Sequence, residues 1–505
     1  MITRRAALST GLATGLLSAQ RSGRKPNFLF LLADDHAGYV LGAFGNKLAE
    51  TPNLDQLAAQ GAHFTSHYCN SPVCTPSRQS FFTGQMPSTA GVTVLRTALS
   101  EQKPTLAKQL KSAGYQTAVI GKMHFNTPSK PGLHGFDHVM CEDALNRAWM
   151  AKGVGHPPPD SVRTKPQWRP FRDPASIWLN SEKLPFPRHD GEMKGTFLAS
   201  EACRYLENNK DKQFALWVSF HEPHSPFDFP VEDAARIAPS KFTPPRIGPE
   251  DAWQIPIIFR DLSPEQRQGI IAAYYTSARF LDKNLGAVLS KLSALGLDDN
   301  TYVVYMADHG YSLGHHGRFE KHCGYDPAMH VPLIMRWPGK IREGRKVTDF
   351  TEHIDVSATI LDMLGATPLP AQHGESLRKY LEGGRVSKPR DHIVSQYLEN
   401  EEVFARTGRW KYIFCSGQRK RTDGYLIDNP TPGRYRRLYD LKADPGEFTD
   451  VAAKHPAVVK EMEEKILARF RATHPEAASE PKGSGDESRA KSLEFYVRPR
   501  DAQPV

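Results

Sequence analysis

The chain has 505 residues, of which 39% are hydrophobic and 24% charged, and its 65 basic and 56 acidic residues give a formal charge of +9. A chain of this length can bury the core of one large α/β domain and of a smaller second one. No internal stretch is long and apolar enough to span a bilayer, so no integral membrane segment is expected. The positive charge favours anionic substrates, but without a nucleic-acid-binding motif it predicts no nucleic acid partner.

The first 20 residues have the pattern of an export signal. Arg4-Arg5 precede a short apolar run that ends in Ser18-Ala19. Paired arginines before such a run are typical of twin-arginine signals, although a general secretory signal or a frayed helix would share much of the pattern. Residues 1–20 are therefore predicted to be an export signal, and the mature protein is expected in the periplasm or outside the cell.

Four apolar runs are predicted to be β-strands, at 27–33, 117–120, 214–220 and 301–307. Continuous apolar runs of this length are typical of strands buried on both faces of a parallel sheet. The polar residues that follow the four runs are, in order, Asp34-Asp35, Lys122 with His124, His221 with His224, and Asp308-His309. Because ligands bind outside the carboxyl ends of the strands in open α/β sheets, these four ends are predicted to converge on one site.

Helices are predicted between the strands from capping residues and apolar spacing. They are expected at 52–57, 76–83, 105–113, 196–207, 264–296 and 355–364, the fifth with a break, and a further strand is expected at 331–335. Strands that alternate with helices predict an α/β fold, with a doubly wound, mostly parallel sheet flanked by helices.

A long insertion interrupts this pattern. Residues 143–195 are rich in proline and contain Trp149, Trp168 and Trp178. A loop of this length in a compact domain is usually functional or mobile. Its tryptophans are expected either to line a substrate pocket or to fix the loop to the protein surface, since amphipathic aromatic side chains serve both purposes.

The pattern changes again towards the C-terminus. Residues 24–380 are predicted to form the catalytic domain and residues 381–474 a smaller α+β subdomain. The subdomain is expected to contain a hairpin of strands at 402–406 and 410–413, a third strand at 437–441 and a helix from Pro456. Residues 475–505 are rich in Glu, Ser, Gly, Lys and Pro and are predicted to be a poorly ordered low-complexity tail.

A nucleophile and an anion-binding site are predicted at Cys74-Thr75-Pro76-Ser77-Arg78. Pro76 suits the first turn of a helix, so Cys74 is expected at a helix N-terminus, where free N–H groups and the helix dipole attract anions. Arg78 adds a planar fork that binds two oxygens of a tetrahedral anion. A cysteine in an ordinary helix-capping turn is the alternative.

Carboxylates at two of the strand ends predict a divalent cation beside this nucleophile. Asp34, Asp35 and Asp308, with an oxygen from position 74, suit Ca²⁺, which prefers oxygen ligands. His309 leaves Mg²⁺, Mn²⁺ or Zn²⁺ open. Helix capping is the alternative for either acidic pair.

Lysines and histidines at the strand ends complete the predicted chemistry. Lys122 and Lys321 would stabilise charge that develops on an ester, and His124 and His224 would transfer protons. Taken singly, each would be a surface lysine or a structural histidine, so the prediction depends on their occurring together.

The chain resembles the type I, formylglycine-dependent sulfatases of the alkaline-phosphatase-like superfamily, from residue 27 to at least residue 451. Their signature C-x-P-S-R is residues 74–78, and five further motifs follow in the family's order. These are G-K-x-H at 121–124, H-x-P-H-x-P at 221–226, D-H/N-G at 308–310, G-x-H-G-x-x-x-K at 314–321 and L-Y-D-L-x-x-D-P-x-E at 438–447.

The resemblance implies a modified nucleophile and a bound metal. A formylglycine-generating enzyme would oxidise Cys74 to formylglycine, whose hydrated aldehyde attacks the ester. One divalent cation, normally Ca²⁺, would be bound by the formylglycine and by four further ligands. These are Asp34, Asp35, Asp308 and His309.

The resemblance also implies roles for the remaining residues. Arg78 and Lys122 would steady the formylglycine diol and the metal-bound oxygens, and His124 would assist breakdown of the covalent sulfate ester. His224 and Lys321 would contact the leaving group, with His224 as general acid. His221 and His316 are expected to contact the substrate.

The predicted function is that of a sulfuric ester hydrolase. It would cleave an organic sulfate monoester, with a sulfated carbohydrate favoured, through a formylglycine-sulfate intermediate. A choline-sulfatase-like activity and a phosphonate monoester or phosphodiester hydrolase of the same fold are the enzymatic alternatives. An inactive relative that only binds carbohydrate is the non-enzymatic one.

Overall fold

A computed structural model of the chain describes residues 25–153, 188–234, 236–419, 425, 427 and 433–500. The predicted export signal and two of the three tryptophans of the insertion, Trp168 and Trp178, lie outside the described residues. Within them, no helix is both long and apolar enough to cross a membrane. All six cysteines lie in the described part, and no disulfide bond joins any two of them.

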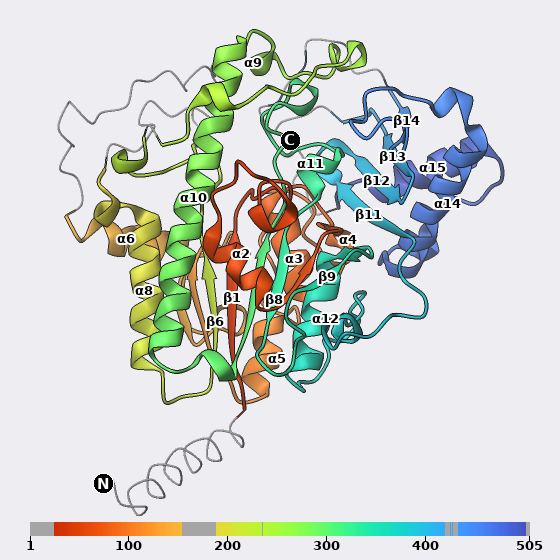
Figure 1. Ribbon diagram of the computed structural model, residues 1–505. Helices are drawn as coiled ribbons and strands as arrows, with labels where there is room; N and C mark the ends of the chain where they lie inside the picture. The colour runs from red at the N-terminus through yellow and green to blue at the C-terminus, as the bar shows by residue number, and fades with distance from the viewer. Residues whose placement is uncertain are drawn as a thin grey trace, which may run out of the picture.

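An eight-stranded sheet forms the centre of the molecule (Figure 1). Its strands, in spatial order, are β5 (His138–Met140), β4 (Gln116–Gly121), β6 (Phe214–Ser219), β1 (Asn27–Ala33), β7 (Thr301–Ala307), β8 (Leu333–Arg336), β2 (Ala62–Phe64) and β9 (Arg345–Val347). The four strands predicted to carry the site, β4, β6, β1 and β7, are adjacent and parallel. Their carboxyl ends therefore lie at one edge of the sheet, as predicted.

The strand expected at 331–335 is present as β8, but it runs antiparallel to β7 and β2. Its carboxyl end consequently lies at the opposite edge of the sheet from the predicted site. The doubly wound, mostly parallel α/β fold is confirmed, with β8 as the strand that makes the sheet mixed.

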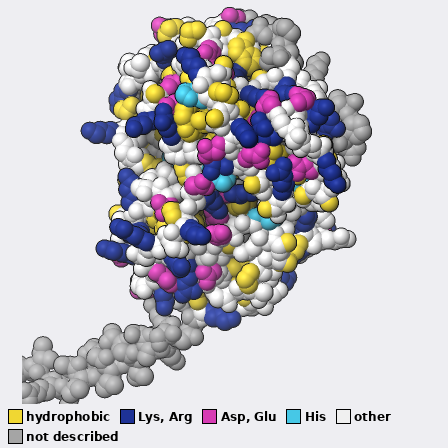
Figure 2. Space-filling view, turned by 90° about the vertical axis from the view of Figure 1, so that its right-hand side faces the viewer, with side chains coloured by type: hydrophobic (Ala, Val, Ile, Leu, Met, Phe, Trp, Pro, Cys, Tyr) yellow, Lys and Arg dark blue, Asp and Glu magenta, His cyan; other side chains and the backbone are white. Residues whose placement is uncertain are grey.

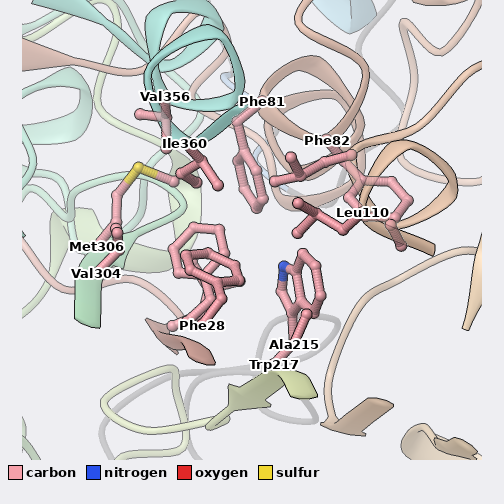
Figure 3. Close-up of a cluster of buried hydrophobic side chains, with 14 of the residues drawn as sticks. Phe28, Phe81, Phe82, Leu110, Ala215, Trp217, Val304, Met306, Val356 and Ile360 are labelled. Carbon is pink, nitrogen blue, oxygen red and sulfur yellow. The ribbon is translucent and has the colours of Figure 1, made fainter. Parts of the chain in front are cut away.

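Helices cover both faces of the sheet because alternate residues of each buried strand point to opposite sides. Phe28, Phe30 and Leu32 of β1 face three helices, α3 (Cys74–Thr83), α5 (Leu106–Ser112) and α12 (His353–Met363). Figure 3 shows this cluster, with Phe81, Leu110 and Ile360 from those helices packed against the sheet.

The other face packs against three more helices, α2 (Pro52–Ala59), α8 (Lys194–Asn208) and α10 (Pro264–Ala294). Leu29 and Leu31 of β1 point to this side. α10 has no break over its 31 residues, contrary to the expectation, and a capping box between Ser263 and Gln266 begins it. Helices α8 and α10 run side by side along this face (Figure 1).

A second, antiparallel sheet forms the core of the C-terminal part. Its strands are β11 (His392–Tyr397), β12 (Glu402–Thr407), β13 (Trp410–Cys415) and β14 (Tyr435–Asp440), paired in that order. The predicted hairpin is β12 and β13, and the predicted helix is α14 (Pro456–Thr473). Figure 2 shows this side of the molecule, where basic and acidic side chains are interspersed.

The expectation of a poorly ordered tail after residue 475 is wrong for most of that segment. Residues Asp486–Val497 form α15, and its Leu493, Tyr496 and Val497 are buried against the sheet and α14. The Tyr496 ring stacks on Phe470 of α14 with centroids 4.7 Å apart. Apolar residues spaced three and four apart give α15 its buried face despite the polar composition around them.

The remaining strands and α-helices of the described residues are short. They are β3 (His67–Tyr68), β10 (Thr351–Glu352), α4 (Pro87–Ala90), α6 (Glu142–Met150), α9 (Ile257–Arg260), α11 (Asp326–Met329) and α13 (Arg378–Leu381). Trp149 lies at the end of α6, where its Nε1 donates to the carbonyl of Glu192 at 2.9 Å and the Arg188 guanidinium lies 4.9 Å over its ring. Trp149 thus joins the end of α6 to the segment at residues 188–192.

Candidate active site

The predicted nucleophile lies at a helix N-terminus. Helix α3 begins at Cys74, after Val73 in an extended conformation, and ends before Gly84, whose φ of 67° closes the helix in the left-handed region. All ten residues of α3 are buried, and Cys74 is 2% exposed. Free backbone N–H groups of the first turn therefore point towards the position that the Cys74 side chain occupies.

The ends of β1 and β7 bring carboxylates to this cysteine. The Sγ atom of Cys74 lies 3.5 Å from Oδ1 of Asp34 and 3.2 Å from Nε2 of His309. Because β1 and β7 pair in register up to Ala33 and Ala307, the residues that follow these strands are neighbours.

Four buried side chains could hold a metal ion at this point. Asp34, Asp35, Cys74 and His309 each offer a ligand atom, and these atoms lie within 4.8 Å of one another. Two carboxylates, an imidazole and an oxygen-bearing residue at position 74 would form a mixed oxygen and nitrogen donor set that fits a divalent cation. The residues present therefore fit the predicted metal.

Asp308 lies beside this group with its carboxylate engaged by protein. Its Oδ1 accepts hydrogen bonds from the backbone N–H groups of Asp35 and His309, and its Oδ2 accepts one from Nε of Arg78 at 2.8 Å. Its role as a fifth ligand stays a prediction.

Arg78 is fully buried and connects the elements of the site. Besides its bond to Asp308, its NH2 lies 3.5 Å from Oδ2 of Asp34, and its NH1 donates to Oγ of Ser219 and to the carbonyl of Lys122. Burial alone would lower the pKa of Arg78, but the two aspartates raise it above the ordinary value. In this structure the fork is directed at protein carboxylates and a carbonyl, and its predicted contact with the formylglycine diol stays a prediction.

Two buried lysines supply positive charge around position 74. Lys122 forms an ion pair with Oδ2 of Asp34, and its Nζ lies 3.9 Å from Sγ of Cys74. Lys321 contacts both carboxylate oxygens of Asp35, at 2.8 and 3.0 Å. Burial alone would lower the pKa of Lys321, but Asp35 raises it well above the ordinary value, so this lysine is charged.

The electrostatic balance at position 74 favours an anion there. Burial and the charge of Asp34 raise the pKa of the Cys74 thiol, but Lys122, Lys321 and His309 together outweigh them, and the net shift is downward. Burial likewise raises the pKa of Asp34, yet the charge of Lys122 holds it well below the ordinary value. Whatever group occupies position 74, these cations stabilise its negatively charged form.

Two histidines in the segment that follows β6 lie beside the same buried carboxylates. Nε2 of His224 lies 3.8 Å from Oδ2 of Asp35, and its Nδ1 hydrogen-bonds to the carbonyl of Ser225. The His221 ring lies 4.7 Å from the His224 ring. Burial, followed by the charge of Lys321, lowers the pKa of His224 well below its usual range, so the imidazole is neutral.

His124 follows Lys122 in a strained backbone conformation, with φ of 55°. Burial and the neighbouring charge of Lys122 lower the pKa of His124 to about 3. The carboxyl ends of β4, β6, β1 and β7, the first turns of α3 and the loop that carries Lys321 thus bring together eleven of the twelve predicted site residues.

Comparison with known proteins identifies the family. The sulfatase family model matches residues 26–366, which is more than half of the chain. The chain belongs to the sulfatase family. A second family model, the C-terminal region of N-sulphoglucosamine sulphohydrolase, matches residues 314–472.

Curated relatives and a solved structure agree with this assignment. This sulfatase is 27% identical to choline-sulfatase of Rhizobium meliloti, over 89% of this chain and 87% of that protein. It is also 27% identical to Delta 4,5-hexuronate-2-O-sulfatase of Bacteroides thetaiotaomicron, over 90% and 89% of the two chains. The structure of phosphonate monoester hydrolase of Agrobacterium radiobacter matches with a TM-score of 0.74 and 25% identity, over 91% of this chain and 98% of that one.

The twelfth predicted residue, His316, contacts other side chains in this sulfatase. It is 1% exposed, its Nδ1 lies 2.8 Å from Oδ1 of Asp251, and its ring stacks on Tyr325 with centroids 3.6 Å apart. Its own φ of 55° and the buried pair with Asp251 indicate that it holds the loop before Lys321. The predicted substrate contact of His316 stays a prediction.

Sequence reasoning missed the polar residues that support the site. Ser219 at the end of β6 donates to the carbonyl of Lys122, and Gln79 and Glu142 bind the backbone on either side of His124. Gln79 directly follows the signature, and this adjacency is the sequence signal that could have identified it. Nothing in the sequence around Glu142 pointed to the site.

Proposed function

We propose that this sulfatase hydrolyses an organic sulfate monoester with formylglycine, formed from Cys74 by a formylglycine-generating enzyme, as its nucleophile. The observation that carries the proposal is the position of Cys74 at the N-terminus of α3, with His309, Asp34 and Lys122 between 3.2 and 3.9 Å from its sulfur. The cations around it are groups that stabilise the negative charge of a sulfate ester as it reacts.

The bound groups would supply two things. As its hydrate, formylglycine would supply one hydroxyl to attack sulfur, with the alcohol as leaving group, and a second hydroxyl whose deprotonation would reform the aldehyde with release of sulfate. A divalent cation, favoured as Ca²⁺ and held by Asp34, Asp35 and His309 with Asp308 as a further ligand, would neutralise negative charge on the ester oxygens.

The chain's own residues would then position the substrate and stabilise charge. Lys122 and Lys321 flank position 74 and would offset the charge of the sulfate group as the ester bond breaks. Through its Nδ1 contact with the carbonyl of Ser225, His224 presents Nε2 to the site. It would donate a proton to the departing oxygen in its protonated form, which the negative charge of a bound sulfate ester favours. His221 would contact the leaving-group side of the substrate.

A sulfated saccharide is the substrate class that the comparisons support best. One relative is named for a hexuronate, and the C-terminal family model is named for a sulphoglucosamine hydrolase. A choline-sulfatase-like activity is the second candidate, favoured by the similarity to the Rhizobium protein over 89% of this chain. A phosphonate monoester hydrolase activity is the third, favoured by the structural similarity to the Agrobacterium enzyme.

The test of this function combines mass spectrometry with turnover. Protein produced with a formylglycine-generating enzyme is expected to show an aldehyde in place of the CH₂SH group of Cys74, and to hydrolyse 4-nitrophenyl sulfate faster than 4-nitrophenyl phenylphosphonate. Sulfated monosaccharides and choline sulfate would then be compared directly. An unmodified thiol in active protein would overturn the formylglycine nucleophile, and a faster phosphonate reaction would overturn the sulfatase activity.

A divalent cation is expected to stabilise the protein measurably. Asp34, Asp35 and His309 lie close together, and an ion that neutralises the two carboxylates binds the folded chain only. At a concentration 100 times the dissociation constant, binding adds about 2.7 kcal/mol. Chelation should therefore lower the thermal midpoint and abolish turnover, and Ca²⁺ titration should restore both. Better recovery with Mg²⁺ or Zn²⁺ would contradict the choice of calcium.

We also propose that the protein acts outside the cytoplasm, on the basis of the pattern in residues 1–20. In the same way, the boundary between a catalytic domain at 24–380 and a C-terminal subdomain at 381–474 is proposed from the change in element pattern. The antiparallel sheet that begins at β11 supports this boundary.

A further inference from the structure

The segment after β4 carries two of the proposed catalytic side chains on an unusual backbone. Lys122 and His124 are separated by one residue, and His124 has φ of 55°. The left-handed region is unfavourable for a residue with a Cβ atom, and it persists only where the surroundings impose it. Something must therefore hold this segment in place.

Glu142 binds the backbone N–H groups of the segment. Its Oε1 accepts a hydrogen bond from the N–H of Met123 at 3.0 Å and another from the N–H of His124 at 2.5 Å. Glu142 is the first residue of α6, in the strand-to-helix connection after β5. A single carboxylate oxygen thus fixes two consecutive peptide groups.

Gln79 binds the carbonyl groups of the same segment from the opposite side. Its Nε2 donates to the carbonyls of Met123 and His124, at 3.1 and 3.2 Å. Gln79 is fully buried in α3, directly after Arg78, whose NH1 donates to the carbonyl of Lys122. The helix that carries Cys74 therefore also fixes the carbonyl side of the segment.

We propose that Gln79 and Glu142 are positioning residues that set Lys122 and His124 relative to position 74. Between them they bind the backbone N–H and C=O groups of both Met123 and His124. Rotation of either peptide group would break at least one of these hydrogen bonds. We call this pair of residues, Gln79 and Glu142, the clamp. The inference rests on the proposed function for the catalytic roles of Lys122 and His124, but the hydrogen bonds themselves do not.

The expected effect on the rate follows from the position of Lys122, which the clamp holds close to position 74. Nζ of Lys122 lies 3.9 Å from Sγ of Cys74 and in contact with Asp34. Rotation of the peptide groups at Met123 and His124 would move both side chains, and a displacement of about 1 Å in a catalytic group can reduce the rate on the order of 100-fold. Substrate contacts on the β6 and Lys321 side would be unaffected, so kcat should fall more than KM rises.

The test compares Glu142→Ala, Glu142→Gln and a matched control, Asp143→Asn. Asp143 is the next residue of α6, and its carboxylate contacts Ser129 and Arg147 rather than the catalytic segment. We expect kcat to fall about 10- to 100-fold in Glu142→Ala. The amide carbonyl of glutamine still accepts both N–H groups, so Glu142→Gln should recover most of the rate, and Asp143→Asn should match the unaltered protein.

A second readout does not depend on activity. Hydrogen exchange in peptides covering residues 121–126 should be faster in Glu142→Ala than in Glu142→Gln or Asp143→Asn, in protein with either a thiol or formylglycine at position 74. If Glu142→Ala does not fold, Gln79→Met, which removes the donor at similar volume, should give the same loss of kcat and faster exchange.

The outcomes separate the clamp from the proposed function. Faster exchange with an unchanged kcat would overturn the positioning role and leave only a structural one. Unchanged exchange would overturn the clamp itself. If the unaltered protein hydrolyses no sulfate ester, the proposed function fails and the catalytic part of the inference fails with it, while the exchange data still decide whether the clamp exists.

Discussion

Replacing Cys74 by alanine is expected to abolish sulfate ester turnover, with kcat falling on the order of 10⁶-fold, as for removal of other enzymatic nucleophiles. The alanine side chain offers neither a nucleophilic atom nor a site for conversion to formylglycine. Its neighbours would remain in place, because the backbone of α3 is buried along its whole length. Substrate binding should therefore persist while turnover is lost.

Cys69 provides the matched control for this variant. It is a buried cysteine five residues before Cys74, 1% exposed, and its Sγ contacts the carbonyl of Ala328 at 4.0 Å. Burial raises the pKa of the Cys69 thiol far above its usual value, whereas the pKa of Cys74 is lowered. Steady-state assay of Cys69→Ala should give a rate within a few-fold of the unaltered protein. Turnover by Cys74→Ala above a tenth of that rate would contradict the nucleophile assignment.

The contrast between these two cysteines shows what the sequence contains and what only the fold provides. The motif at residues 74–78 predicts a helix N-terminus, and α3 begins at Cys74. The lowered pKa, however, depends on Lys122 and Lys321, which come from distant parts of the chain. The position of Lys122 was predictable because the apolar run before it is long enough to be recognised as a buried parallel strand. The position of Lys321 was implied by the motif at 314–321.

Three features that the sequence does not reveal have a common physical origin in long-range packing. The direction of β8 depends on its pairing with β7 and β2, which its own apolar residues do not encode. α15 is stable because Tyr496 and its neighbours pack on α14, although the surrounding composition is that of a disordered tail. His316 matches a motif, yet Asp251, which pairs with it, is 65 residues away.

The same reasoning explains why the clamp residues were missed. Glu142 acts by binding backbone N–H groups. Every residue except proline has such a group, so the residue types at 123 and 124 do not indicate the contact. Gln79 is adjacent to the signature, but its role depends on the path of residues 122–124. Side chains that bind ligands directly can be predicted from chemistry, whereas side chains that position them require the fold.

The largest expected effect on stability comes from a buried charge network between the two parts of the molecule. Asp326, at the start of α11, accepts hydrogen bonds from Nε of Arg406 at 2.8 Å and from Nζ of Lys411 at 3.0 Å. Arg406 lies on β12 and Lys411 on β13, so these bonds join the C-terminal sheet to the catalytic part. The Lys411 side chain is 0% exposed.

Asp326→Asn is expected to lower the free energy of unfolding by about 3 kcal/mol, at the lower end of the cost of breaking a buried pair. Asparagine leaves the buried ammonium of Lys411 without a full counter-charge. The lower end applies because the Asp326 side chain is 25% exposed and because Glu447, 3.8 Å from Lys411, remains. Burial raises the pKa of Glu447 to about 7, so it takes over this role only in part at neutral pH.

The pH dependence of this contribution has a definite sign. Burial alone would raise the pKa of Asp326, but Lys411 and then Arg406 hold it well below its ordinary value of 3.8. A carboxylate with a depressed folded-state pKa contributes stability that is fully present above the unfolded-state pKa and is lost as the pH falls below it. The difference in denaturant midpoint between Asp326→Asn and the unaltered protein should therefore be constant between pH 5 and pH 6 and shrink below about pH 4.

Two further variants isolate the cause. Asp391→Asn removes an aspartate that is 68% exposed and pairs with Lys465 at 2.6 Å, and it should cost less than about 1 kcal/mol because exposed ion pairs are screened by water. Lys411→Met in the Asp326→Asn background removes the unpaired ammonium and should restore much of the stability. If Asp326→Asn cost no more than Asp391→Asn in chemical denaturation, the network would not hold the C-terminal sheet to the catalytic part. If the double variant is more stable than Asp326→Asn alone, the unpaired ammonium of Lys411 is the source of the loss. The pairing of charges, rather than the shape of residue 326, then joins the two parts.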